Sequence, residues 1–148
     1  MEAIVQLLSH CATNLSVPKA RSRAAGFFYL SDKPKNPKKA PKSDDPPPMH
    51  NRAISITSKI MREVLSSAAE AELTGLFHNG KDTCPMKIAL EEVGHKQLAT
   101  PIITDDSTAM GIANDEVKQK RFKAIDMRFH WIRDRVRQGQ FIDKGKQI

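Results

Sequence analysis

Short apolar runs near the start of the chain predict a β-sheet. Ile4–Leu8 is mainly apolar, and Arg23–Leu30 is rich in aromatic and other strand-favouring residues, so each is typical of a strand. Arg52–Ile60 alternates with a period of two and predicts the clearest strand of the chain. We expect Arg52–Ile60 to pair antiparallel with Arg23–Leu30, so that the three strands form a meander.

Helical periodicity follows the third strand. Ser67, with Glu70 three residues later, predicts an N-cap and a capping box. Pro85 is expected to kink the helix or to start a new one, and Gly94 is expected to end it. Apolar or small residues recur on one predicted helix face, at Ala69, Leu73, Leu76, Phe77 and Gly80.

The second half of the chain predicts a further strand, two helices and the start of a last strand. Pro101–Thr104 predicts a short strand, Ser107–Ala113 a short helix, and Phe141–Ile142 the last strand. The chain from Asp126 through Arg137 predicts a helix whose buried side holds Met127, Trp131 and Ile132. A meander followed by a β-α-β crossover predicts an α/β fold, with a mixed sheet flanked by helices.

Composition sets one segment apart. Asp32–His50 contains six of the nine prolines and five lysines, and it has almost no large apolar side chain. Such a segment buries too little surface to order itself, so we expect a mobile Pro/Lys-rich loop at residues 32–50. The length of 148 residues otherwise suits a single domain.

Charge indicates an anionic partner. The chain carries 24 Lys and Arg against 17 Asp and Glu, a formal net charge of +7, which favours nucleic acid or a membrane surface. The alternative is a basic domain without such a partner. The basic residues gather in Pro18–Lys42 and Val117–Arg137. These two blocks form either one phosphate-binding surface or two separate solvated faces.

The sequence argues against membrane insertion, secretion and zinc binding. No apolar run approaches the roughly 20 residues of a membrane helix. The uncharged stretch Ala3–Val17 lacks the basic segment that opens a secretory signal. Cys11 and Cys84 are far apart and have no CxxC neighbour, so no zinc site is expected. We expect a cytoplasmic or nuclear protein without a signal peptide or transmembrane segment.

Two pairs of acidic residues are candidates for a metal site. Glu70 or Glu72 lies at a helix start, and Asp105 or Asp106 follows a strand. Carboxylates that meet in a cleft hold divalent metals, and two metals about 4 Å apart support phosphodiester hydrolysis. Only one member of each pair is expected to point inward. The alternative is that these acids complement helix N-termini and form a turn.

Four stretches carry a resemblance to a known family. SSAAEAEL (Ser66–Leu73), TDDSTA (Thr104–Ala109) and AIDMRFHWIRDRV (Ala124–Val136) resemble the ribonuclease H domain of copia-type LTR retrotransposon Pol polyproteins. PKARSRAAGFFYLSD (Pro18–Asp32) is similar to the segment after the first active-site strand of that domain. The resemblance implies a ribonuclease H-like fold. It also implies cleavage of the RNA strand of an RNA/DNA hybrid, with two Mg²⁺ ions held by four carboxylates.

The resemblance assigns the catalytic and metal-binding acids residue by residue. Glu72 matches the second acid, and Asp105 matches the third. Cys11 stands where the family has its first aspartate, and a thiol is a poor ligand for Mg²⁺. The chain ends at Ile148, before the motif of the fourth acid, so we expect the C-terminal strand and helix to be largely missing from an incomplete domain. We also expect the upstream reverse transcriptase domain of the family to be absent from this chain.

Three functions remain open for such a degenerate, truncated copy. The first is an active metal-dependent ribonuclease H. The second is a module that binds nucleic acid weakly without cleaving it, and the third is a copy with no selected biochemical role. Because two of the four acids are missing by alignment, we expect cleavage to be lost. The expected nucleic-acid-binding residues are Lys19, Arg21, Arg23, Lys120, Arg121, Lys123 and Arg128.

Overall fold

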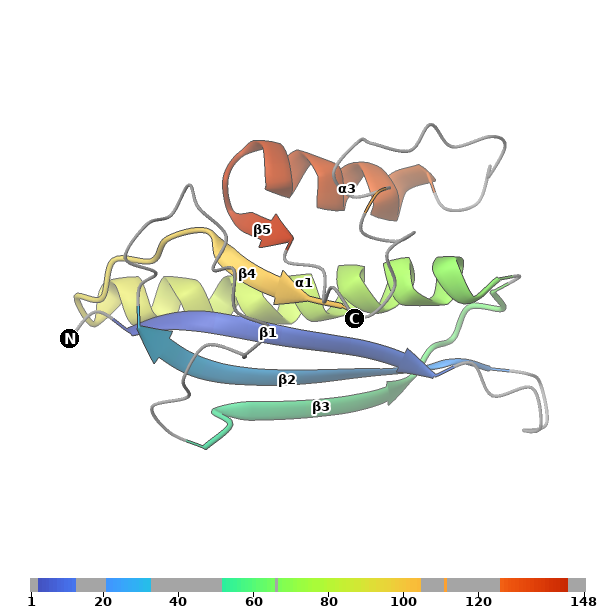
Figure 1. Ribbon diagram of the computed structural model, residues 1–148, viewed down its shortest axis with the longest axis horizontal. Helices are drawn as coiled ribbons and strands as arrows, with labels where there is room; N and C mark the ends of the chain where they lie inside the picture. Colours follow the sequence, from blue (N-terminus) through green and yellow to red (C-terminus); the bar gives the residue numbers. More distant parts are fainter. Residues whose placement is uncertain are drawn as a thin grey trace.

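A mixed sheet carries two helices packed on it (Figure 1). The computed structural model describes residues 3–12, 21–32, 52–65, 67–104, 111 and 126–143. The strands of these residues lie in the order β3-β2-β1-β4-β5. Their bounds, with those of the helices, are β1 (Ala3–Ala12), β2 (Arg23–Asp32), β3 (Ser55–Ile60), α1 (Ala68–Glu92), β4 (Thr100–Ile103), α3 (Asp126–Arg137) and β5 (Phe141–Asp143).

Both predicted kinds of strand pairing are present. β1 pairs antiparallel with β2, where Ala12 lies opposite Arg23, and β2 pairs antiparallel with β3. On its other side, β1 pairs parallel with β4, where Leu7 lies opposite Ile102. β4 in turn pairs parallel with β5. The predicted α/β fold, a three-strand antiparallel meander extended by a parallel strand, is confirmed.

Some predicted segments differ in extent from the structure or lie beyond the described residues. The third strand begins at Ser55, so the first three residues of the predicted strand Arg52–Ile60 precede it. Asp32 is the last residue of β2, and residues 33–50 of the predicted loop are outside the described residues. Of the predicted helix Ser107–Ala113, only Gly111 is described. Across the ranges that the structure describes, no helix is both long and apolar enough to cross a membrane.

α1 begins at the predicted cap and ends at the predicted glycine. The Oγ of Ser67 accepts a hydrogen bond of 3.1 Å from the backbone N–H of Glu70. Gly94 has a φ of 97°, and its N–H donates to the carbonyl of Glu91, as in a Schellman terminus. Pro85 lies inside this single helix, so the predicted alternative of a new helix at Pro85 is wrong. Packing along the sheet outweighs the hydrogen bond that the proline removes.

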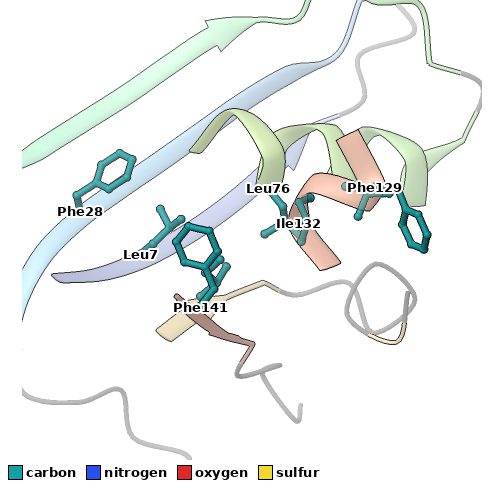
Figure 2. Close-up of a cluster of buried hydrophobic side chains, with 8 residues drawn as sticks. Leu7, Phe28, Leu76, Phe129, Ile132 and Phe141 are labelled. Atoms are coloured by element: carbon teal, nitrogen blue, oxygen red, sulfur yellow. The ribbon is translucent and has the colours of Figure 1, made fainter. Parts of the chain in front are cut away.

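A cluster of apolar side chains joins the sheet to both helices (Figure 2). Its members come from β1, β2, β4, β5, α1 and α3, so the two helices pack together on one face of the sheet. Each of these side chains is almost completely shielded from solvent, and their burial is the main contribution to stability. The buried members are Leu7, Phe28, Leu73, Leu76, Ile102, Phe129, Ile132 and Phe141.

The buried face of α3 differs from the predicted one. Ile132 is buried and Trp131 packs against the cluster, as expected. Met127 is 85% exposed, however, so its predicted burial is wrong. Phe129 occupies the core instead, because Phe129 and Ile132 are three residues apart and share a helix face that Met127 does not.

A buried amide ties α1 to three strands. The side chain of Asn79 is 2% exposed. Its Nδ2 donates to the Oγ of Ser9 in β1 at 2.9 Å and to the carbonyl of Ala25 in β2 at 2.9 Å. Its Oδ1 accepts from the Oγ1 of Thr57 in β3 at 3.5 Å. Because both amide protons and the amide oxygen are engaged, Asn79 fixes the position of α1 along the meander.

Gly26 leaves the space that this amide needs. A Cβ atom at position 26 would lie 2.6 Å from the Oδ1 of Asn79 and 2.9 Å from the Oγ1 of Thr57. Both neighbours are held by the hydrogen bond between them, so neither moves without breaking it. A glycine at this position therefore permits the close approach of helix and sheet.

Replacing the amide tests its role in stability. We expect Asn79→Leu to lower the free energy of unfolding by about 2–4 kcal/mol, because the Ala25 carbonyl and the Ser9 hydroxyl lose a buried partner. Denaturant titration followed by circular dichroism measures the change. The matched control is Glu92→Ala at an exposed position of the same helix, where we expect a change within about 0.5 kcal/mol. Equal stabilities for the two variants would contradict the assignment.

Candidate nucleic-acid interface and acidic site

The direction of α1 decides which side chains meet at each end of the sheet. Asn79, in the middle of α1, contacts Ser9 near the end of β1. Gln97, beyond the C-terminus of α1, accepts a hydrogen bond of 3.2 Å from the N–H of Val5 near the start of β1. α1 therefore runs opposite to β1, and its N-terminus lies at the carboxyl end of that strand (Figure 1).

Glu72 lies at this carboxyl end. It precedes Asn79 by seven residues, which is about 10 Å along the helix axis. The side chain of Glu72 is 6% exposed and that of Glu70 is 9% exposed, so both acids are buried. Burial alone does not say which of the two points into the cleft, so the expectation that only one of them does stays a prediction.

The other two expected positions of the acidic site are only partly described. β1 and β4 are parallel, so their carboxyl ends meet at the same edge of the sheet as the start of α1. The backbone of Cys11 pairs with Ala24 one residue before the end of β1. The Cys11 side chain and all of Asp105 lie outside the described residues. The convergence of Cys11, Glu72 and Asp105 thus stays a prediction.

Two arginines of the first basic block lie at the start of β2, at the same edge of the sheet. Arg23 opens β2 opposite Ala12, the last residue of β1, and it pairs with Ile60 on β3. Its side chain is exposed, and its guanidinium donates a hydrogen bond of 3.2 Å to the Ser58 hydroxyl. Because that partner is neutral, the bond leaves the charge of Arg23 available to a ligand. Arg21, two residues before Arg23, is half-buried.

Arg62 is a member of this surface that the sequence pattern does not reveal. The backbone N–H of Met61 donates to the carbonyl of Ser22 at 2.9 Å, which extends the β2–β3 ladder past Ile60. The continued register puts Arg62 across from Arg21, and the Arg62 side chain is exposed. Arg62 belongs to neither basic block of the sequence. Only the pairing of β2 with β3 brings it to the other arginines.

Arg128 reaches the same end of the molecule from the first turn of α3. Its guanidinium lies 2.6 Å from the Oε1 of Glu63, and the Nε2 of His78 lies 3.6 Å from the same oxygen. Burial raises the pKa of the Glu63 carboxyl, but a backbone hydrogen bond and the charges of Arg128 and His78 outweigh it and lower the pKa below its ordinary value. Arg128 therefore also holds α3 against the segment after β3, and Glu63 offsets much of its charge.

We call the edge of the sheet with these four residues the arginine end: Arg21, Arg23, Arg62 and Arg128. It holds described members of both basic blocks, but Arg23 shares the sheet face of Ile60, away from α1, whereas Arg128 lies on α3. That the two blocks form one phosphate-binding surface stays a prediction. The other expected nucleic-acid-binding residues lie outside the described residues: Lys19, Lys120, Arg121 and Lys123.

The donor atoms described at this edge do not fit a pair of Mg²⁺ ions. Mg²⁺ requires hard oxygen ligands in octahedral geometry. Among the described residues, no group of three or more His, Cys, Asp and Glu side chains is arranged to hold a metal. Asp105, one of the expected ligands, lies outside the described residues, so the expected metal site stays a prediction.

Comparisons with solved structures define the fold. The chain superposes on the N-terminal ribonuclease H domain of Rv2228c from Mycobacterium tuberculosis, solved as a fusion with maltose-binding protein, with a TM-score of 0.60 and 10% identity over 97% of this chain and 81% of that one. It superposes on LC11-RNase H1 in complex with an RNA/DNA hybrid with a TM-score of 0.60 and 10% identity, over 97% of this chain and 86% of that one. The protein therefore has a ribonuclease H-like fold.

Sequence comparison finds a similar region in a retrotransposon polyprotein. The chain is 34% identical over 84 residues to the retrovirus-related Pol polyprotein from transposon TNT 1-94 of Nicotiana tabacum. The matched region is 57% of this chain and 6% of that polyprotein. No family model matches the chain. The structural similarity confirms the predicted ribonuclease H-like fold, and the sequence is similar to part of a retrotransposon Pol polyprotein, in line with the resemblance.

The Glu63 ion pair makes a small part of the stability dependent on pH. The Glu63 pKa is lowered in the folded protein, so its contribution is complete above the ordinary value of 4.5 and is lost as the pH falls through the folded value. We expect the wild-type protein to exceed Glu63→Gln in unfolding free energy by about 0.5 kcal/mol near neutral pH, because the pair is partly solvated. Denaturant titrations at several pH values measure the difference. A difference that stays constant below pH 4.5 would contradict the ion-pair assignment.

Proposed function

We propose that this domain binds RNA/DNA hybrids through the arginine end. The observation that carries the proposal is that arginines from β2, the segment after β3 and α3 all lie toward the end of the sheet where α1 begins. A row of cations from separate elements matches the repeating phosphates of a duplex backbone. The structural neighbour LC11-RNase H1, solved in complex with an RNA/DNA hybrid, supports the choice of ligand.

The individual arginines contribute unequally to this binding. Arg23 is exposed and donates one hydrogen bond to the neutral hydroxyl of Ser58. Arg62 is also exposed, and it lies opposite Arg21 in the continued β2–β3 register. These three guanidinium groups are the main phosphate contacts of the proposal. Arg128 contributes less, because an approaching phosphate competes with the Glu63 carboxylate at 2.6 Å. The contacts are to the backbone, so binding is weak, salt-sensitive and independent of sequence.

We further propose that binding occurs without useful cleavage of the RNA strand. Two-metal hydrolysis needs a carboxylate that bridges both ions, so that one ion activates the water and the other stabilises the leaving oxygen. By the resemblance to the family motif, Cys11 stands at that position. Glu72 and Asp105 together supply two negative charges for two divalent cations, which repel each other in a partly dry site. Glu72 is then a buried acid that stabilises the start of α1.

Charge removal at the arginine end tests the binding surface. We expect the double variant Arg23→Ala/Arg62→Ala to bind a fluorescent RNA/DNA hybrid more weakly at low salt. The slope of log affinity against log salt should fall by about 1 for each phosphate that the variant no longer binds. The matched control is Lys96→Ala, an exposed cation beyond the C-terminus of α1 at the opposite end of the helix. Equal weakening in this control would show that only net charge matters and would contradict the proposed surface.

A cleavage assay tests the second part of the proposal. With Mg²⁺, we expect the unmodified protein to leave the RNA strand of a hybrid intact, and we expect at most trace cleavage with Mn²⁺, which tolerates softer ligands. Cys11→Asp alone should restore little activity, because it supplies one carboxylate where the resemblance assigns only Glu72 and Asp105 besides. Glu72→Gln is the control for contaminating nuclease. Robust cleavage by the unmodified protein that disappears in Glu72→Gln would refute the proposal.

A further inference from the structure

One carboxylate oxygen joins α1, α3 and the segment after β3. The Oε1 of Glu63 lies 2.6 Å from the guanidinium of Arg128 on α3 and 3.6 Å from the Nε2 of His78 on α1. All three side chains are partly exposed, Glu63 to 25%, Arg128 to 29% and His78 to 36%. Protons and a ligand from solution therefore reach these three residues, which we call the Glu63 cluster.

The charge of His78 decides how many cations share the Glu63 carboxylate. With a neutral imidazole, Glu63 and Arg128 form a one-to-one ion pair. A histidine gains a positive charge as the pH falls through the range just below neutrality. Burial raises the pKa of the Glu63 carboxyl, but its backbone hydrogen bond and the neighbouring Arg128 and His78 lower it by more, to below 4.5. Glu63 therefore stays charged in that range, and one carboxylate then faces two cations.

The other charged groups beside His78 leave this balance intact. Lys81 and Asp82 lie one turn further along α1, at the spacings that bring helix side chains together. Their charges are opposite in sign, and the Oδ2 of Asp82 lies 2.8 Å from the Nζ of Lys59 on β3. Within the described part of the chain, Glu63 is the carboxylate within ion-pair distance of His78. A charge gained by His78 therefore acts mainly on Glu63.

We propose that protonated His78 takes over the Glu63 carboxylate and releases Arg128 to a phosphate of the bound hybrid, so that binding strengthens as the pH falls below neutrality. This inference rests on the proposed function, in which Glu63 and the phosphate compete for Arg128. When His78 is neutral, a phosphate that takes Arg128 leaves a partly buried carboxylate without a cation, which costs free energy. When His78 is charged, Glu63 keeps a cation after Arg128 leaves. His78 is thus a positioning residue that acts through Glu63 without touching the ligand.

The pH dependence of hybrid binding tests the role of His78. The affinity for a fluorescent RNA/DNA hybrid is measured at fixed low salt, at about pH 8 and at about pH 5.5. We expect the unmodified protein to gain about two- to fivefold more affinity over this range than His78→Gln, because the released contact resembles a partly solvated ion pair. The matched control is His95→Gln, beyond the C-terminus of α1, which should keep the full gain. Equal gains for the unmodified protein and His78→Gln would overturn the proposal.

Two further variants separate the release of Arg128 from a direct contact between His78 and the hybrid. In an Arg128→Met background, adding His78→Gln should leave the pH dependence unchanged, because no guanidinium is there to be released. Glu63→Gln should bind more tightly than the unmodified protein at about pH 8, because a neutral amide competes less for Arg128. If His78→Gln removes the same gain with and without Arg128, the imidazole itself contacts the phosphate, and the proposal is overturned.

NMR of the hybrid-free protein keeps this test separate from that of the proposed function. Carbon-detected spectra follow the guanidinium nitrogens. As the pH falls from about 8 to about 5.5, the Arg128 signal should move toward that of the exposed Arg62, and in His78→Gln it should stay in place. An unmoved Arg128 signal in the unmodified protein would overturn the inference whether or not hybrids bind. A moving signal in a protein that binds no hybrid at either pH would refute the proposed function, and the exchange of partners at Glu63 would stand.

Discussion

The three hydrogen bonds of the Asn79 amide are the constraint on which the arrangement of the site depends. A shift of α1 by one residue along the sheet rotates each of its side chains by about 100° and removes the amide from all of its partners. Such a buried, fully satisfied polar group rejects alternative packings that a purely apolar surface tolerates. This matters in a chain with 39% apolar and 5% aromatic residues, whose apolar core alone specifies the helix position weakly.

From this position of α1, the direction of each element determines what meets at the arginine end. α1 runs opposite to β1, so Glu72 lies at the carboxyl end of that strand. β2 starts and β3 ends at the same edge, which brings Arg23 and Arg62 there. Placing these cations at one end costs electrostatic repulsion, and Glu63 compensates the charge of Arg128 there. The proposed hybrid-binding surface is thus a consequence of strand register.

The features that the sequence predicted are those with local causes. The period-two pattern predicted β3, and Ser67 and Gly94 predicted the ends of α1. Both kinds of signal are local, because strand alternation and helix capping act within a few residues. Met127 was misplaced because apolar residues of α3 define more than one possible helix face, and packing against α1 selects between them. Asn79 and Arg62 have no local signal, since their roles arise only when β2, β3 and α1 come together.

Binding of nucleic acid at the arginine end is most directly tested by an NMR titration of the ¹⁵N-labelled protein with a short RNA/DNA hybrid at low salt. We expect the first and largest amide shifts at Arg21, Arg23, Arg62 and the first turn of α1, all weakening as salt is added. Residues at the opposite end, such as Gly94 and Lys96, should stay unchanged. Shifts that begin at the opposite end, or that are absent at the arginine end, would contradict the proposed interface.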